Sequence, residues 1–333
     1  METRTFGRLG PVSALSLGGG GIGQVWGETN RAEAVATLRE AVDAGISLID
    51  VAPAYGKGEA ESVVGETFGG HLPAGIRVST KCALYAPWSK VQGELGPQPV
   101  PPERAGAIIE RTLTESLARL RLTRIDILFL HDQLVPDGQE ATHPGTTRTT
   151  FVEVVRPTFE RLLAQGRIGA WGVSAIGVAR ALIETFNDEP VPYAAQIEVN
   201  LLHSRPATGS SFASPESTEL VETANQRGVA VMGIRPTQSG ALTSGFDRSV
   251  DAEAQEYFRR AAAYRALATE LGETPAALAH RYALSVPGVS TVTLGVKSRA
   301  ELREALSAEE RGPLAQSIVD MLEASVALGH MLR

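Results

Sequence analysis

Four polar side chains that can move a proton follow three consecutive apolar runs of the sequence. Asp50 closes the run "ISLI", and Tyr55 follows it in a loop marked by proline and glycine. Lys81 lies in "VSTK" near the end of the next run, and His131 lies in "LFLHD" near the end of the one after. If these runs are neighbouring parallel strands, about 5 Å apart, the four side chains can meet at one end of the sheet.

These residue types suit the protonation of an oxygen that gains negative charge. A free tyrosine has a pKa near 10, which is too high for efficient proton transfer at neutral pH. An ammonium such as Lys81 favours the phenolate and lowers that pKa, and Asp50 can keep the lysine charged and in place. A neutral His131 can donate a hydrogen bond that orients the substrate oxygen. A carbonyl that accepts hydride develops such a charge.

Each residue alone has a structural explanation, because strand-end acids often cap loops and buried lysines often form ion pairs. The combination on three consecutive strands is what favours chemistry. A Schiff-base lyase that uses Lys81 is the alternative from another reaction class. The six histidines never form a His-X-His pair, so no metal site is expected. The sequence also lacks Gly-X-Ser-X-Gly and P-loop motifs, and its glycine-rich "LGGGGIG" lacks the acid-ended context of a dinucleotide-binding Gly-X-Gly-X-X-Gly fingerprint.

The overall composition is that of a soluble globular protein. The chain has 333 residues, of which 43% are hydrophobic, and this is enough apolar material for a large core. A net charge of −7 argues against nucleic-acid and anionic-membrane partners. A single cysteine excludes an intramolecular disulfide framework and fits a reducing compartment. With a polar "METRTFGRLG" start and no long apolar run, we expect a cytoplasmic protein.

The elements that must position the four residues alternate regularly between strands and helices. Apolar runs predict strands at residues 12–20, 47–52, 76–84, 125–133, 168–176, 193–201, 229–236 and 290–296. Helical periodicity predicts helices at residues 31–45, 59–68, 102–122, 151–165, 178–186, 217–228, 251–271, 275–284 and 299–308. This alternation predicts one (β/α)₈ barrel domain over residues 1–333, with a doubly wound open sheet as the alternative.

Three long segments follow predicted strands, at residues 86–102, 134–149 and 237–250. All three lie at the carboxyl ends of the strands. That face carries the active site in barrel enzymes, and loops of this length are usually functional or disordered.

The sequence resembles the aldo-keto reductases over nearly its whole length. "LIDVAPAYGKGEAESVVG" is similar to the family pattern Asp-Thr-Ala-x-x-Tyr-Gly-x-Ser-Glu, and "VSTK" and "LHD" match its lysine and histidine segments. "RTFGRLGPVSALSLGGGGIG" resembles its N-terminal hairpin and first strand. The resemblance implies a TIM barrel with a short N-terminal β-hairpin and extra C-terminal helices. It also implies Tyr55 as general acid/base, Lys81 and Asp50 as its supporting pair, and His131 as the residue that orients the carbonyl.

The resemblance further implies a nicotinamide cofactor, NADP(H) more than NAD(H). "WGVSAI" and "AAQIEVNLL" correspond to the segments that bind the carboxamide, "RPTQSGALTSG" to the pyrophosphate loop, and "LGVKSRAELREAL" to the adenosine segment. Asn200 lies near the second carboxamide ligand. The expected cofactor contacts are Gly20, Gly21, Ser174, Gln196, Arg235, Pro236, Gln238, Gly240, Leu242, Gly295, Lys297, Ser298, Glu301 and Glu304.

Departures from the family pattern bear on the cofactor and the substrate. Ile234 replaces an aromatic residue, and Arg235 after it can reach the cofactor or an anionic substrate, or form a structural ion pair. A carboxylate at Glu301 favours NAD, whereas Lys297 favours NADP.

The expected substrate contacts are Trp26, Trp88 and Asp132, for an aldehyde, ketone or aldose. A sugar-oxidising, NAD-dependent dehydrogenase of the same family is an alternative. So is a cofactor-binding regulatory subunit, although the complete set of four residues favours an enzyme. We expect a monomer or a small homo-oligomer.

Overall fold

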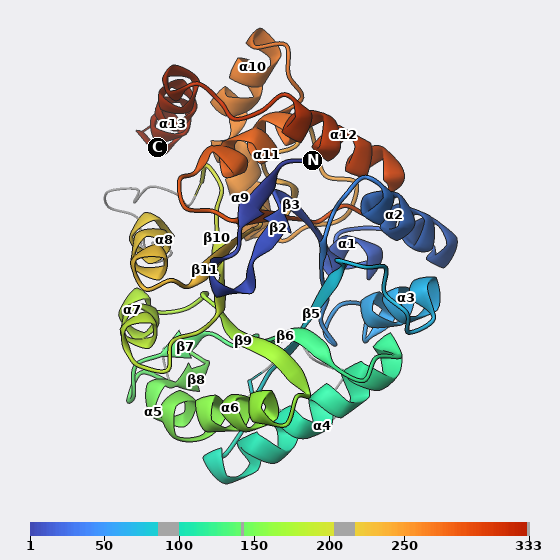
Figure 1. Cartoon of the computed structure of the whole chain (residues 1–333). Coiled ribbons are helices and arrows are strands. Elements are labelled where there is room, and N and C mark those ends of the chain that lie inside the picture. Colours follow the sequence, from blue (N-terminus) through green and yellow to red (C-terminus); the bar gives the residue numbers. More distant parts are fainter. Residues whose placement is uncertain (86–99, 141–142, 203–216, 332–333) are drawn as a thin grey trace.

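The computed structural model describes residues 1–85, 100–140, 143–202 and 217–331, and its centre is a closed barrel of eight parallel strands (Figure 1). The barrel strands are β3 (Leu15–Gly18), β4 (Leu48–Asp50), β5 (Arg77–Cys82), β6 (Ile125–Leu130), β9 (Ile168–Ser174), β10 (Ala194–Glu198), β11 (Ala230–Ile234) and β12 (Thr291–Leu294). They follow one another around the barrel in chain order, and β12 closes it against β3. This confirms the predicted barrel and excludes the open sheet.

Helices surround the barrel because each strand is followed by an amphipathic segment (Figure 1). Side-chain caps begin several of them; for example, the Asn30 side chain accepts from the backbone N–H of Glu33 at the start of α2. The outer helices are α1 (Gly19–Ile22), α2 (Arg31–Asp43), α3 (Glu59–Phe68), α4 (Pro102–Leu120), α5 (Arg148–Thr150), the π-helical η2 (Phe151–Val155), α6 (Arg156–Ala164), α7 (Ala179–Asn187), α8 (Ser217–Gln226), α11 (Pro275–Ser285) and α12 (Arg299–Glu310).

Three further helices lie on the C-terminal side of the molecule; the first of them is closer to the barrel, and the other two lie at the top of Figure 1. They are α9 (Ala252–Arg260), α10 (Ala262–Glu270) and α13 (Gln316–Met331). A second apolar cluster lies between them and α11, and it includes Tyr264 of α10, Leu278 of α11 and Leu322 of α13. They are the extra C-terminal helices that the resemblance implied. In the described part of the chain, no helix has the length and apolar character needed to cross a bilayer.

The interior of the barrel changes from apolar at its amino end to polar at its carboxyl end. An antiparallel hairpin, β1 (Thr3–Thr5) with β2 (Pro11–Ser13), closes the amino end. Phe6 and Val12 from this hairpin pack against Phe129 and Met232 from the barrel strands. Side chains two residues apart lie on the same face of a strand. A strand can therefore direct an apolar side chain into the amino end of the barrel and a polar side chain into its carboxyl end.

The structure corrects three predicted element boundaries. The strand expected at residues 12–20 is divided between β2, β3 and α1, because the chain must turn from the hairpin into the barrel. The helix expected at residues 251–271 is interrupted at Ala261, which joins α9 and α10. The loop at residues 134–149 contains two short strands, β7 (Leu134–Val135) and β8 (Thr146–Thr147), which pair in parallel. These two-residue strands are too short for a periodic signal.

Candidate active site

A buried ion pair lies at the polar end of the barrel interior. Lys81 Nζ donates to Asp50 Oδ2 at 2.6 Å and to the carbonyl oxygen of Val51 at 3.0 Å. Lys81 is 1% exposed and Asp50 is 2% exposed, so both charges depend on each other rather than on water. The strands that carry them, β4 and β5, are neighbours in the barrel.

The second oxygen of Asp50 is also fully engaged. Asp50 Oδ1 accepts from Ser79 Oγ at 2.6 Å and from Gln196 Nε2 at 2.8 Å. Gln196 lies on β10, which stands opposite β4 in the barrel order, so this hydrogen bond crosses the interior. Ser174 Oγ on β9 lies 3.3 Å from Gln196 Oε1. A polar network therefore joins the predicted carboxamide ligands to the ion pair.

Tyr55 and His131 stand beside this ion pair. Lys81 Nζ lies 5.0 Å from the centre of the Tyr55 ring, and the rings of Tyr55 and His131 meet edge to face with centres 5.8 Å apart. All four predicted catalytic residues thus come together. The His131 backbone N–H donates to the carbonyl oxygen of Cys82 at 2.8 Å, which continues the β5–β6 pairing to the height of the site.

Burial dominates the protonation of these groups. It raises the pKa of Tyr55 above its ordinary value of 10, although the charge of Lys81 acts in the opposite direction, as expected. Burial, followed by the charges of Lys81 and Arg235, lowers the pKa of His131 to about 3. For Lys81, burial is the largest single effect and opposes the charged form, but the charges and hydrogen bonds of Asp50 and Tyr55 together outweigh it, so the pKa is raised above 10.5. At neutral pH the site therefore holds a neutral histidine, a protonated tyrosine and a charged lysine.

A second ion pair occupies the ends of β10 and β11. Arg235 Nη1 pairs with Glu198 Oε1 at 2.5 Å. Arg235 has a positive φ of 54°, a strained conformation for this residue. Its carbonyl oxygen accepts from Asn200 Nδ2 at 3.1 Å, and the same amide donates to Gln238 Oε1 at 3.0 Å. Arg235 is thus held in a structural ion pair, while its charge still acts on both Tyr55 and His131.

The start of α12 carries the residues expected near the adenosine. Ser298 caps this helix by accepting from the backbone N–H of Glu301 at 3.3 Å. Lys297 Nζ pairs with Glu301 and also with Asp247 Oδ2 at 2.8 Å. The ammonium is therefore already matched by two carboxylates. Glu304, one turn further along, accepts from the side-chain hydroxyl of Thr274, which is the N-cap of α11.

Other predicted cofactor residues make close contacts between protein segments. A Cβ on Gly21 would lie 1.9 Å from the carbonyl oxygen of Val296, and one on Gly20 would lie 2.3 Å from Trp26 Nε1. Gly295 also faces the indole of Trp26, and Arg248 lies 5.6 Å from the centre of that ring. The remaining members of the predicted pyrophosphate loop are Pro236 and Leu242, which are buried, and Gly240, which faces the ring of Phe246. Their cofactor contacts stay predictions.

The side chains present fit the group that the resemblance implies. Ser174 on β9 and Gln196 on β10 are a buried hydroxyl and a buried amide, which suits an uncharged carboxamide, whereas the amide of Asn200 is engaged with Arg235, Gln238 and Leu202. Gln238, Ser239 and Gly240 have consecutive positive φ values of 45°, 53° and 101°. Such backbone conformations can turn N–H groups toward a phosphate, but here the N–H groups of Gln238 and Gly240 donate to the carbonyl oxygens of Arg235 and Thr237. Within the described residues, no group of three or more His, Cys, Asp and Glu side chains is arranged to hold a metal ion.

The predicted substrate residues have different outcomes. Trp26 is half-buried over the glycines that follow β3. Asp132 is buried, and its Oδ2 accepts from the backbone N–H groups of Leu84 and Tyr85 and from Thr146 Oγ1. Trp88 lies outside the described residues. Substrate contact by these three residues stays a prediction.

Several partners of the site were not predicted from the sequence. Ser79 is one that could have been found, because it lies two residues before Lys81 and so shares its face of β5. Glu198 could have been found in the same way, two residues after Gln196 on β10. Asp247 gives no such signal, because it lies in a loop that meets Lys297 only in the folded protein.

Comparisons with known proteins agree with this geometry. The Aldo/keto reductase family profile matches residues 14–327. L-galactose dehydrogenase from Arabidopsis thaliana is 25% identical over 313 residues, covering 92% of this chain and 88% of the relative.

Two solved structures share the fold over most of their length. Glycerol dehydrogenase from Gluconobacter oxydans has a TM-score of 0.71 at 20% identity, covering 98% of this chain and 95% of that one. An aldo-keto reductase from Klebsiella pneumoniae in complex with NADPH has a TM-score of 0.68 at 22% identity, covering 98% and 96%. On the strength of the profile match, which spans nearly the whole sequence, this chain belongs to the aldo/keto reductase family and is an NAD(P)-dependent oxidoreductase.

Proposed function

We propose that this enzyme transfers hydride between a nicotinamide cofactor and a carbonyl or alcohol substrate, with Tyr55 as the proton donor. The observation that carries the proposal is the meeting of four groups at one end of the barrel. Lys81 Nζ lies 5.0 Å from the Tyr55 ring centre, the ring of His131 lies at 5.8 Å from it, and Asp50 holds the lysine at 2.6 Å.

Ser174 and Gln196 would hold the nicotinamide, and the segments around Gln238 and Lys297 would hold the phosphates and the adenosine. The cofactor supplies or accepts the hydride when it is bound. The amide of Gln196 carries two N–H groups and one acceptor oxygen. One N–H group already binds Asp50 and the oxygen accepts from Ser174 Oγ, so the second N–H group and the other lone pair of the oxygen are what can orient the carboxamide.

The chain's own residues handle the oxygen of the substrate. His131 is neutral at physiological pH, so its ring N–H can donate to a carbonyl oxygen without giving up the proton. Tyr55 donates its hydroxyl proton to that oxygen as charge develops there. Lys81 stabilises the tyrosinate left behind, and Asp50 keeps Lys81 charged. In the reverse direction the same groups remove the alcohol proton.

An aldehyde, ketone or aldose is the substrate class that fits this chemistry. The full-length similarity to L-galactose dehydrogenase favours an aldose, and sugar oxidation is the alternative direction. NADPH was expected over NADH. The carboxylates of Glu301 and Asp247 at Lys297 oppose that preference, because a 2′-phosphate must compete with them for the ammonium. A comparison of KM for NADPH and NADH decides between the two cofactors.

The two other reaction classes are less well supported. A Schiff-base lyase needs a neutral, nucleophilic lysine, but Asp50 keeps Lys81 protonated and Lys81 also donates to the Val51 carbonyl. Borohydride would trap a carbonyl substrate on Lys81 if that function were correct. A regulatory subunit would not need the complete set of four groups, and here all four come together.

Tyr55→Phe tests the proposed role directly. We expect turnover to fall by at least about a thousandfold while cofactor binding is retained, because the ring stays and only the acidic hydroxyl is lost. Tyr193→Phe is the matched control, because Tyr193 lies at the amino end of the barrel near Phe6 and Phe129 and should keep full activity. A panel of aldehydes, ketones and aldoses, followed by nicotinamide absorbance in both directions, measures both variants. Unchanged turnover in Tyr55→Phe would reject the assignment.

A further inference from the structure

Asp132 connects the two strand ends that carry Lys81 and His131. The β5–β6 ladder ends at the pair Cys82 and Leu130, and the next link is the His131 N–H to the Cys82 carbonyl. Beyond it, Asp132 Oδ2 accepts from the backbone N–H groups of Leu84 at 2.7 Å and Tyr85 at 3.1 Å. The carboxylate thus extends the connection between the two strands past the point where their own hydrogen bonds stop.

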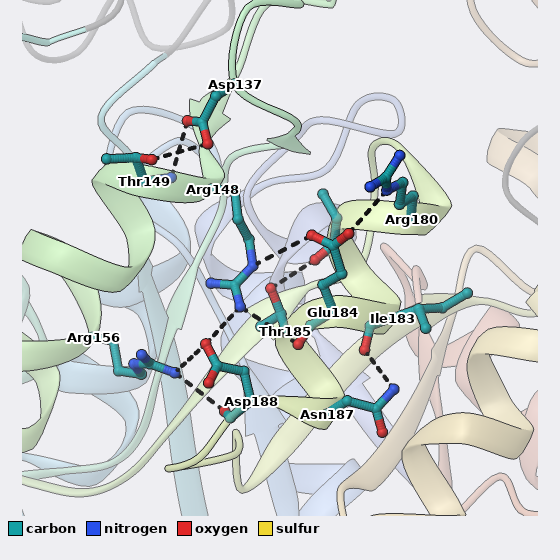
Figure 2. A network of polar contacts seen from close by, with 11 residues as sticks. Asp137, Arg148, Thr149, Arg156, Arg180, Ile183, Glu184, Thr185, Asn187 and Asp188 are labelled. Atoms are coloured by element: carbon teal, nitrogen blue, oxygen red, sulfur yellow. Dashed lines mark hydrogen bonds and ion pairs between the residues drawn. The ribbon is translucent and has the colours of Figure 1, made fainter.

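A third hydrogen bond ties the same oxygen to a segment that is fixed from outside. Thr146 Oγ1 on β8 donates to Asp132 Oδ2 at 2.8 Å, and the Thr146 backbone N–H donates to the carbonyl oxygen of Gln133 at 2.8 Å. Two residues further on, Arg148 pairs with Asp188 Oδ2 at 2.7 Å and with Glu184 Oε2 at 4.0 Å, both at the α7 end of the fold. Figure 2 shows Arg148 pointing at these two carboxylates.

The neighbouring contacts in Figure 2 strengthen this attachment. Thr149 Oγ1 donates to Asp137 Oδ2 at 2.9 Å, which closes the segment between β7 and α5 on itself. Arg156 Nη1 lies 3.2 Å from Asp188 Oδ2, so Asp188 is held from two sides. The hydroxyl of Thr146 therefore sits on an anchored segment, against which Asp132 can hold the chain after β5.

We infer that Asp132 is a positioning residue, whose ionised carboxylate clamps the chain after β5 to the chain after β6 and so fixes the position of His131 relative to Lys81. The inference rests on the proposed function of those two residues. Backbone N–H groups and hydroxyls bind a carboxylate more strongly than a neutral carboxyl group. The clamp is therefore tight when Asp132 is ionised and loose when it is protonated.

The surroundings of Asp132 place this change near neutral pH. Burial raises the pKa of Asp132 to about 7, against the effect of its hydrogen bonds. Its second oxygen, Oδ1, is buried and has no hydrogen-bond partner among the described residues, so the proton can be carried there. The nearest titratable residues are Cys82 on β5, whose thiol feels the charge of Asp132, the next residue in sequence His131, and Tyr85, whose backbone N–H donates to Asp132. The pKa of Cys82 is raised well above 9 and that of His131 is lowered to about 3, so neither titrates near pH 7.

The first test is the pH profile of kcat/KM with a carbonyl substrate that does not ionise. For the native enzyme we expect kcat/KM to rise with pH around 7 and to reach a plateau above it. Asp132→Asn should stay on the low plateau across this range, about tenfold or more below native at pH 8 and similar to it at pH 5. Thr146→Val removes one hydrogen bond that lowers the pKa, so its profile should move up by about one pH unit.

Thr185→Val is the matched control for Thr146→Val. Thr185 is equally buried, but its hydroxyl donates only within α7, to the Ala181 carbonyl at 2.7 Å. Its profile should match the native one. A purely structural loss in Thr146→Val would lower the whole profile without moving it. An unshifted profile in Thr146→Val, or a rise near pH 7 that persists in Asp132→Asn, overturns the proposal.

A second test needs no turnover. Cys82 is the single cysteine of the chain, so thiol labelling at pH 9 reports opening at the end of β5. Thr146→Val should be labelled several-fold faster than the native protein, and Thr185→Val should not. If the native protein shows no turnover with either cofactor, the proposed function is rejected but the clamp is not, because the labelling rate still tests it. Equal labelling of Thr146→Val and the native protein would reject the clamp even in an active enzyme.

Discussion

Asp50→Asn should destabilise the protein, because it removes the negative charge that balances the buried ammonium of Lys81. Among the described residues, Asp50 is the one carboxylate that forms an ion pair with Lys81. The substitution keeps the size of the side chain and removes its charge. Three donors point at the carboxylate, from Lys81, Ser79 and Gln196. An asparagine offers them one acceptor oxygen and adds two N–H groups of its own. At least one buried donor must then lose its partner, and the charge on Lys81 is no longer balanced.

The size of the loss has an upper limit set by the lysine itself. Removing one partner of a buried ion pair usually costs about 3–5 kcal/mol. Lys81 can avoid the full cost by giving up its proton. The ordinary pKa of a lysine lies about 3.5 units above pH 7. Removing the proton at pH 7 therefore costs about 5 kcal/mol, at 1.36 kcal/mol per pKa unit. We therefore expect a loss of 3–5 kcal/mol at pH 7, on the order of half the stability of a typical domain.

The loss should shrink as the pH rises. Without Asp50, burial lowers the folded-state pKa of Lys81 below its unfolded value, so the unfolded chain binds more protons between those two values. Stability then increases with pH in that range, by up to about 1.4 kcal/mol per pH unit. In the native protein the pKa of Lys81 is raised above 10.5, so its contribution is constant below that pH. The difference between the two proteins should fall by about 2 kcal/mol from pH 7 to pH 9.

Urea unfolding at pH 7 and pH 9, without cofactor, measures this effect. Lys81→Met is the matched background, because with no ammonium to leave unpaired Asp50→Asn should cost less and show no dependence on pH. A double-mutant cycle separates the charge from the lost hydrogen bonds. The same pH-independent loss in both backgrounds would refute the reasoning, and so would a loss below about 1 kcal/mol at pH 7.

Two further predictions concern the cationic side chains of the site. Glu301→Gln removes one of the two carboxylates at Lys297, so KM for NADPH should fall about fivefold or more relative to KM for NADH; an unchanged ratio would show that the ammonium does not meet the 2′-phosphate. Arg235→Met removes a charge that lowers the pKa of Tyr55. The rise of kcat/KM for alcohol oxidation with pH, which needs the deprotonated tyrosine, should therefore move to higher pH by up to about one unit. A shift to lower pH would contradict this.

The barrel and the four proposed catalytic residues were predictable because both depend on local patterns. Apolar runs of strand length alternate with amphipathic segments, and a polar residue at the end of such a run is visible in the sequence. The contacts between distant segments were not predictable in this way. The pairing of Lys297 with Asp247, for example, depends on how the loop after β11 folds over the start of α12. The raised pKa of Tyr55 was not predictable either, because it depends mainly on burial and not on the neighbouring charges that the sequence suggests.

The hydrogen bond from Gln196 to Asp50 has a consequence for how binding and chemistry are related. It joins strands on opposite sides of the barrel, so the carboxylate is fixed from β10 as well as from its neighbour β5. The amide is also one that the resemblance assigns to the nicotinamide carboxamide. A ligand that reorients this amide changes the hydrogen bonding of Asp50, and through it the charge balance at Lys81. In the proposed function, cofactor binding and proton transfer share one side chain, so we expect substitutions of Gln196 to alter KM for the cofactor and kcat together.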